Sequence, residues 1–136
     1  MLKEKRELES LASYCIEKSI KFNATNCEVK VENNISETVN LRNKRLENSD
    51  RSDVLSISIT TYINKKKSSS QFTYIDKENT NIMIKKCTEA TKLLPDDKFN
   101  SLPDKKLLTK NTEDLLLFDE STINNEKKLE YLKEVE

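Results

Sequence analysis

Apolar and polar residues alternate with a period of two through the middle of the chain, between Cys27 and Tyr74. The apolar positions of the clearest stretches are Cys27, Val29 and Val31, then Val39 and Leu41, and then Leu55, Ile57, Ile59 and Ile63. Successive side chains of a β-strand point to opposite faces, so this alternation predicts antiparallel strands with one buried face. Helical periodicity on both sides of this region predicts an α+β fold in which two helices cover one face of a sheet.

The two flanking segments carry apolar residues at steps of three and four, as amphipathic helices do. The first segment, residues 4–21, has an apolar stripe of Leu8, Leu11, Ala12, Cys15, Ile16 and Ile20. The second, residues 77–94, has Asp76 as its expected N-cap and is ended by Pro95. Its expected apolar face consists of Met83, Cys87, Ala90 and Leu94, with Ile82 and Leu93 at the border.

The chain contains no glycine, so other residues must form the tips of its hairpins. Asn43–Lys44 and residues 64–67 are the expected tips, because asparagine tolerates a positive φ better than most residues. Glu32–Asn34 is either another turn or a bend in one long strand, since the parity of the apolar positions is the same on both sides. With Arg45–Ser49 and Ser68–Ile75 as further strands, we expect a meander of four or five strands.

The expected domain comprises residues 1–110, and residues 111–136 form a tail that starts a missing region. This tail contains the apolar run Leu115–Phe118 and a third helix over residues 123–135, capped near Ser121 or Thr122, with Leu129 and Leu132 as its apolar contacts. Because the helical pattern continues to Glu136, the sequence predicts a truncated fragment or a split reading frame.

Composition excludes several classes of function. The chain has no histidine, which excludes imidazole-based triads and most zinc sites, and without glycine it has no phosphate-binding loop. Lys and Arg total 24, as do Asp and Glu, so no net charge attracts nucleic acid or an anionic membrane. No apolar run reaches the roughly 20 residues of a membrane helix. Cys15, Cys27 and Cys87 are far apart, which is typical of a reduced, soluble, cytoplasmic protein with small buried thiols.

Three polar clusters are candidate sites. Lys65–Lys67, with Ser68–Ser70 and nearby aromatic residues, could contact phosphates, but a solvated hairpin tip that discourages edge pairing is the favoured interpretation. The serines have no activating base. The acidic pairs are Asp96–Asp97, Glu113–Asp114 and Asp119–Glu120, and they lack the spacing and the glycine of a calcium loop. We therefore predict no catalytic, metal-binding or cofactor-binding residue and no cofactor.

Taken in order, these elements resemble the N-terminal domain of the TldD/PmbA family, most closely its PmbA (TldE) members. The landmarks are Arg42–Asn43, Asn48–Asp50, the strand Ile57–Tyr62, the segment Lys66–Ser70 (similar to a family stretch R-K-G-S-A-S), Pro95–Asp96 and Asp104–Leu108. The family has glycines where this chain has Lys44, Asp53 or Val54, and Lys or Ser at the second tip.

The resemblance implies a role in a cytosolic TldD/PmbA heterodimer that cleaves peptides with zinc. The zinc motif of the family, similar to HExxxH, lies downstream of the matched region and belongs to TldD, whereas PmbA is a companion subunit that helps enclose the substrate. The expected function is therefore a non-catalytic domain for subunit and peptide contacts.

The expected partner is a TldD-like subunit, or a second copy bound through the sheet or the helices, and an exposed sheet edge could accept a peptide strand. Nucleic acid and membrane are not expected partners. The alternatives are an autonomous module that uses Lys65–Lys67 to bind nucleic acid, or a decaying gene remnant without activity.

Overall fold

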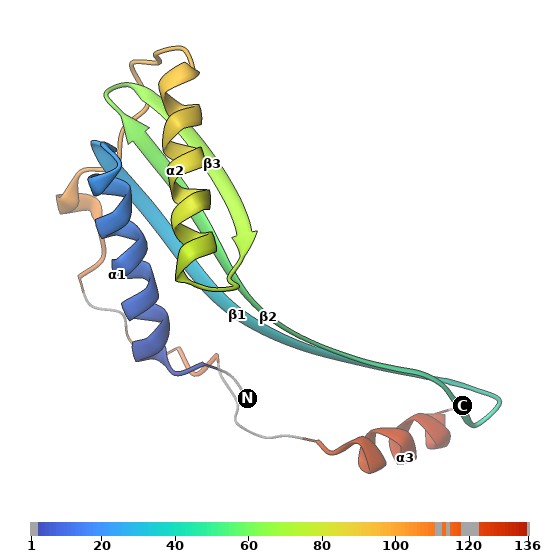
Figure 1. The fold of residues 1–136 in the computed structure, drawn as a ribbon. Coiled ribbons are helices and arrows are strands. Elements are labelled where there is room, and N and C mark those ends of the chain that lie inside the picture. Colours follow the sequence, from blue (N-terminus) through green and yellow to red (C-terminus); the bar gives the residue numbers. More distant parts are fainter. Residues whose placement is uncertain (1–2, 111–112, 114, 118–122, 136) are drawn as a thin grey trace. The chain divides into compact units, whose positions relative to one another are not determined.

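The computed structural model describes residues 3–110, 113, 115–117 and 123–135. The described strands form a three-stranded sheet in which consecutive strands are neighbours, and a helix lies before the sheet and another directly after it in the chain (Figure 1). The elements are α1 (Lys5–Lys21), β1 (Asn26–Arg42), β2 (Arg45–Ile63), β3 (Lys66–Thr73), α2 (Lys77–Leu93), a short 3-10 helix (Lys105–Leu107) and α3 (Asn125–Val135). The predicted α+β class is confirmed. None of the described helices is long and apolar enough to cross a membrane.

The expected count of four or five strands is wrong, because the described residues form a sheet of three strands. β1 continues through Glu32–Asn34 without a turn, and β2 continues from Arg45 to Ile63. Asn33 shows how a polar residue is held inside the strand pair: its Nδ2 donates to Asp53 Oδ1 at 2.8 Å and to the carbonyl of Val54 at 3.3 Å. With no proline in these segments, nothing interrupts the alternation.

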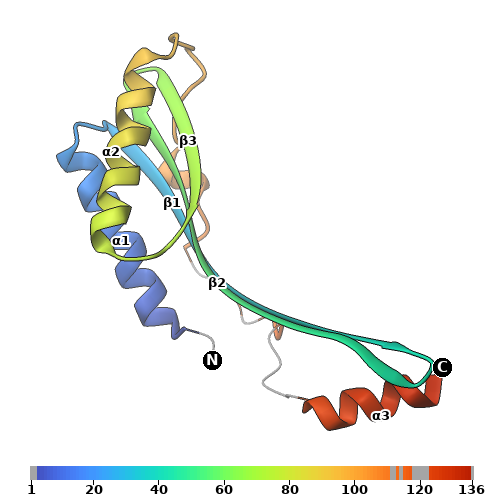
Figure 2. The same ribbon diagram turned by 45° about the vertical axis from the view of Figure 1, so that its right-hand side comes forward.

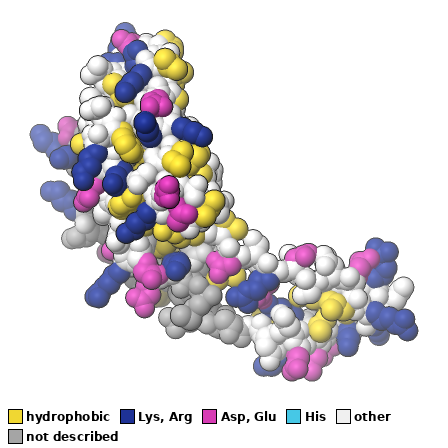
Figure 3. Space-filling view, in the orientation of Figure 1, with side chains coloured by type: hydrophobic (Ala, Val, Ile, Leu, Met, Phe, Trp, Pro, Cys, Tyr) yellow, Lys and Arg dark blue, Asp and Glu magenta, His cyan; other side chains and the backbone are white. Residues whose placement is uncertain are grey.

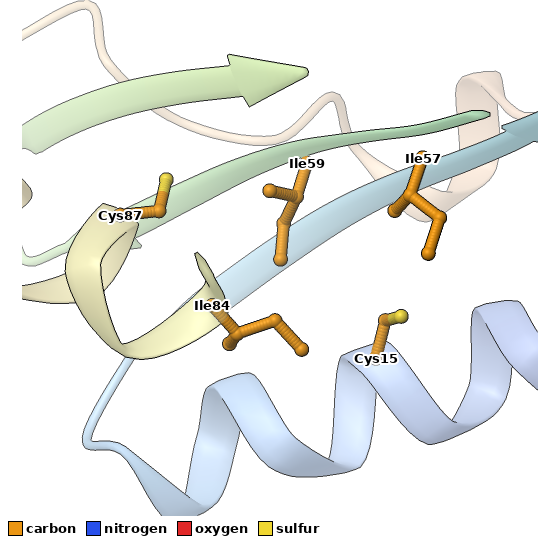
Figure 4. Packing of buried hydrophobic residues seen from close by; sticks show 5 residues of the cluster. All are labelled: Cys15, Ile57, Ile59, Ile84 and Cys87. Atoms are coloured by element: carbon orange, nitrogen blue, oxygen red, sulfur yellow. The ribbon is translucent and has the colours of Figure 1, made fainter. Parts of the chain in front are cut away.

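The chain divides into two compact units, and each is described by itself. The first comprises residues 1–35 and 53–104, and the second comprises residues 36–52 and 105–136. The core of the first unit is formed by Cys15 of α1, Ile57 and Ile59 of β2, and Ile84 and Cys87 of α2 (Figure 4). Ile57 and Ile59 are two residues apart and share one face of β2. Both helices therefore cover that face (Figure 2).

The bounds of α1 agree with the prediction to within one residue, but the buried side of the helix differs. Cys15 and Ser19 are buried, whereas Ile16 and Ile20 of the predicted apolar stripe are 42% and 47% exposed. Ser19 can be buried because its hydroxyl donates to the carbonyl of Cys15 at 2.7 Å, so no polar atom loses its partner.

In helix α2 the buried side differs even more from the predicted apolar face. Its N-cap is Asp76 as predicted, since Oδ1 accepts a hydrogen bond from the N–H of Asn79 at 2.7 Å. The buried residues, however, are Thr80, Ile84, Cys87, Thr88 and Thr91, while Ala90 of the expected face is exposed. Thr80, Thr88 and Thr91 each donate to the carbonyl four residues earlier, at 2.7, 2.9 and 2.8 Å. These bonds allow hydroxyl residues to take positions that hydropathy assigns to Met83 and Ala90.

The hairpin tips are formed without glycine, as expected. Asn43 and Lys44 have φ values of 51° and 54°, which fits the two-residue turn type that matches the twist of a hairpin. Asn64 has a φ of 56° at the second tip. This tip is shorter than the expected segment 64–67, because β3 already begins at Lys66.

In the second unit, α3 lies against the end of the β1–β2 hairpin. Its first turn is capped by Asn124, whose Oδ1 accepts from the N–H of Lys127 at 2.9 Å, while the expected caps Ser121 and Thr122 lie outside the described residues. Lys128 of α3 forms an ion pair with Glu37, which has the same parity along β1 as the half-buried Val39 and Leu41. The predicted contact residues Leu129 and Leu132 are half-buried as well. Leu115–Leu117 are exposed, and Phe118 lies outside the described residues.

Candidate contact surfaces

The lysine cluster does not form a single cationic site. Lys65 lies at the tip, where its carbonyl accepts from the N–H of Asp97 at 3.0 Å. The Nζ of Lys66 donates to the carbonyl of Lys92 at 2.9 Å, whereas the Nζ of Lys67 lies 5.8 Å from the centre of the Tyr62 ring. Figure 3 shows basic and acidic side chains interspersed over the visible face. The ammonium groups of Lys66 and Lys67 therefore do not converge on one phosphate.

The serines and the acidic pairs show no catalytic arrangement. Ser68 and Ser70 are half-buried on the helix side of β3, and Ser69 shares a hydrogen bond of 2.9 Å with Thr60. Asp97 Oδ1 accepts from the N–H of Phe99 at 2.9 Å, and Asp96 Oδ1 lies 3.9 Å from Lys66 Nζ. Of the other pairs, Asp114, Asp119 and Glu120 lie outside the described residues. In the part of the chain that is described, no group of acidic or thiol side chains is placed to hold a metal ion.

The three cysteines are free thiols. Burial, together with a smaller contribution from the nearby Cys27, raises the pKa of Cys15 to about 11. Burial also raises the pKa of Cys27, although its hydrogen bond with Ser19 Oγ, 3.4 Å long, lowers it again in part. Thiols with raised pKa values stay protonated at neutral pH and are poor nucleophiles and poor metal ligands. Cys15 and Cys87 are buried as expected, and Cys27 is half-buried.

A hollow of about 660 Å³ lies beside the first half of α1, and no pattern in the sequence predicts it. Its lining combines Tyr14 and Tyr74 with the charged side chains of Arg6, Glu7 and Lys77. The Tyr14 hydroxyl donates to Asn81 Oδ1 at 2.9 Å, and Lys77 Nζ lies 5.3 Å from the Tyr14 ring centre. Charges of both signs with two tyrosines can bind a polar molecule but offer no reactive group.

The two edges of the sheet can be told apart by their hydrogen bonds. The N–H of Tyr74 donates to the carbonyl of Leu55 at 2.7 Å, and the β2–β3 register continues from this pair without interruption. In an antiparallel pair, residues alternate between those that bond to the neighbouring strand and those that point away from it. Even-numbered residues of β3 therefore bond to β2. The backbone groups that point away from β2 belong to Lys67, Ser69, Gln71 and Thr73.

The same reasoning applies to β1 with the opposite parity. The N–H of Thr25 donates to the carbonyl of Tyr62 at 2.8 Å, which places the odd-numbered residues of β1 toward β2. The outward backbone groups in the first unit then belong to Asn26, Glu28, Lys30, Glu32 and Asn34. The sequence could not identify these rows, because they depend on the pairing register rather than on the alternation of side chains.

Residues 27–90 match the family described as PmbA/TldA metallopeptidase domain 1. The match covers β2 and β3, all of β1 except its first residue, and most of α2, and it includes neither α1 nor α3. A search of curated proteins gave no match.

Proposed function

We propose that the chain is a PmbA-like domain for subunit and peptide contacts, without catalysis of its own, because residues 27–90 match the first domain of the PmbA/TldA metallopeptidase family. The proposed partner is a TldD-like subunit that supplies the zinc site. The protonated thiols, the separately bonded lysines and the absence of histidine from the sequence all agree with a role in binding rather than in chemistry.

The observation that supports a subunit contact most directly is the apolar surface of the two helices. Ile16 and Ile20 of α1 are 42% and 47% exposed, and Ile82 of α2 is 46% exposed, while hydroxyl residues fill the buried positions. Figure 3 shows hydrophobic side chains among the charged ones on this face. A covering protein surface would remove these apolar side chains from water, which is why they support a subunit contact on the helix layer.

Co-purification with a TldD-like subunit tests the proposal. The full chain and the variant Ile16→Asp/Ile20→Asp are each mixed with the purified subunit and analysed by size-exclusion chromatography. We expect a complex with the native chain and its loss with the variant. The control Lys21→Asp places a similar charge on an exposed α1 position without removing apolar surface, and it should retain the complex. Failure of the native chain to associate at low salt would contradict the proposal.

Nucleic-acid binding is the weaker alternative, since Lys66 and Lys67 are directed to different internal partners. A measurable affinity for single-stranded DNA that falls steeply as the salt concentration rises would support nucleic-acid binding instead. A decaying remnant, the other alternative, would unfold without a cooperative transition, in contrast to a packed domain. A cytoplasmic location is part of the proposal, because the three free thiols suit a reducing compartment.

A further inference from the structure

The outer edge of β3 has a row of backbone groups without partners among the described residues. These groups belong to Lys67, Ser69, Gln71 and Thr73, which point away from β2. The next outward carbonyl, that of Lys65, is already bonded to Asp97 and to Asn100 Nδ2, at 3.0 and 3.1 Å. The edge is thus closed at the tip and open from Lys67 to Thr73, which is long enough for a short extended peptide.

The outer edge of β1 in the first unit is less suited to strand addition. Its exposed side chains include Glu28, Lys30 and Glu32, and Lys30 pairs with Glu32 at 2.7 Å. Charged side chains along an edge oppose the addition of another strand. On β3, by contrast, the lysines lie at one end and are followed by the uncharged Ser69, Gln71 and Thr73.

Helix α2 has an apolar flank on its side away from α1. Asn81 marks the side that faces α1, because it accepts the hydrogen bond from the Tyr14 hydroxyl. At about 100° per residue, Ala90 lies about 180° around the helix from Asn81. Met83 and Leu94 lie within about 40° of Ala90 on the side toward the sheet, and Asn79 and Lys86 lie within about 40° of it on the solvent side. Ala90 is exposed and Leu94 is 39% exposed. Since α2 packs on β3, this flank lies on the open-edge side of the sheet (Figures 1 and 2).

The Lys67 end of the edge opens into a second hollow, of about 720 Å³, whose lining includes Lys67, Leu94 and Lys98. The ammonium groups of Lys67 and Lys98 lie over the rings of Tyr62 and Phe99, at 5.8 and 5.0 Å from their centres. Neither lysine forms an ion pair with a described residue. The carboxylates in the lining have other contacts, Asp96 with Lys66 and Asp97 with the N–H of Phe99. The lining therefore holds two cations without an ion pair to a described residue beside two carboxylates, of which Asp96 is paired with Lys66.

We propose that the open edge of β3 binds an extended segment of a partner polypeptide as a fourth strand, antiparallel to β3. The segment has apolar side chains at alternate positions, which pack beneath Met83, Ala90 and Leu94, and a carboxylate at its C-terminal end, which meets Lys67 and Lys98. A second copy of this chain fits less well, because the inward side chains of β3 include Ser68 and Ser70, which would leave the flank of α2 without apolar cover. The inference rests on the contact role proposed above and gives its peptide contact a location.

Peptide titration of the full chain tests this. The probe is fluorescein-Thr-Val-Thr-Val-Thr-Val with a free carboxylate, followed by fluorescence anisotropy at protein concentrations up to about 1 mM. We expect binding that weakens about tenfold for Gln71→Pro, which removes an outward N–H, and little change for Gln71→Val, which keeps it. Lys30→Pro at the β1 edge should bind like the native chain. An amidated probe should bind several-fold more weakly, and Lys67→Glu should abolish this difference.

A second measurement leaves the protein unchanged and so does not depend on whether Gln71→Pro folds. Methylation of alternate backbone nitrogens in the probe removes the donors that face β3, and it should weaken binding as much as Gln71→Pro does. No binding at the highest concentration, equal loss in Lys30→Pro, or a β3-dependent dimer of the chain that excludes the probe would each overturn the proposal. If the probe fails while the TldD-like subunit still associates through the helix layer, only this inference fails and the proposed function stands.

Discussion

The two ends of strand β2 share the same extended backbone but differ completely in burial. Every residue from Arg45 to Val54 is exposed, whereas Ile57 and Ile59, near the other end, are 0% and 1% exposed. The buried end lies beneath two helices, and the exposed end belongs to a unit whose apolar contacts are a few half-buried residues of β1 and α3. Alternation of side chains therefore determines that a segment is a strand, but what covers the strand determines how much free energy it contributes.

The largest expected effect comes from the buried end. Ile59→Ala removes a fully buried side chain from the core and should lower the free energy of unfolding by about 3–4 kcal/mol. Leu46→Ala makes a similar truncation in the same strand, where the side chain is 53% exposed, and should change stability by less than about 0.5 kcal/mol. Urea unfolding followed by circular dichroism measures both. Similar losses in the two variants would refute the contrast between the two ends.

Hydroxyl groups provide a second, smaller test of burial. Thr61 Oγ1 and Thr91 Oγ1 are 2.6 Å apart in the core, and the neighbouring pair Thr60 and Ser69, at 2.9 Å, is on the exposed face. Thr61→Val should cost about 1 kcal/mol, because Thr91 loses a buried partner, and Thr60→Val should cost almost nothing. The double variant Thr61→Val/Thr91→Val should lose less than the sum of the single losses, which thermal unfolding can measure.

The hairpin tips allow a comparison of the two units. Lys44 and Asn64 both have a positive φ, but asparagine adopts this conformation more readily than lysine. Lys44→Gly should therefore stabilise its hairpin end by about 0.5 kcal/mol, and Asn64→Gly should have a smaller effect. Slower amide hydrogen exchange at residues 42–46 would show the gain. Equal exchange rates before and after the substitution would mean that Lys44 is not strained.

The sequence predicted the helix bounds, the Asp76 cap and the asparagine tips, because these features depend on neighbouring residues. The prediction from the sequence was wrong for the features that long-range packing determines, such as which side chains of a helix are buried. Hydropathy assigned Ile16 and Ala90 to buried faces, yet Ser19 and Thr88 are buried instead, since their hydroxyls bond to the helix backbone. The parity of apolar residues could not decide whether Asn33 lies in a turn. Similarly, the unpaired edge of β3 depends on which backbone groups point outward, and composition carries no information about that.

The smallest expected effect concerns the ion pair of the second unit and depends on pH. The hydrogen bond and the charge of Lys128 hold the pKa of Glu37 below its usual value of 4.5, and Arg51, at 2.8 Å, lowers it further. A depressed carboxyl pKa stabilises the folded state above the usual value, and this contribution disappears as the pH falls through the folded pKa. The packing of α3 on the hairpin should therefore weaken below about pH 4.5.

The Glu37 carboxyl can be followed by NMR titration in three variants. In Lys128→Ala its midpoint should rise toward 4.5, and in Arg51→Ala it should rise by less, because Lys128 provides the larger effect. Lys127→Ala removes an exposed neighbouring charge and should leave the midpoint nearly unchanged. Added salt should raise the midpoint in the native chain, since exposed charges are screened. If Glu37 titrates at 4.5 in the native chain, α3 is not held by this ion pair, and among the described residues the half-buried Leu129 and Leu132 remain to explain its position.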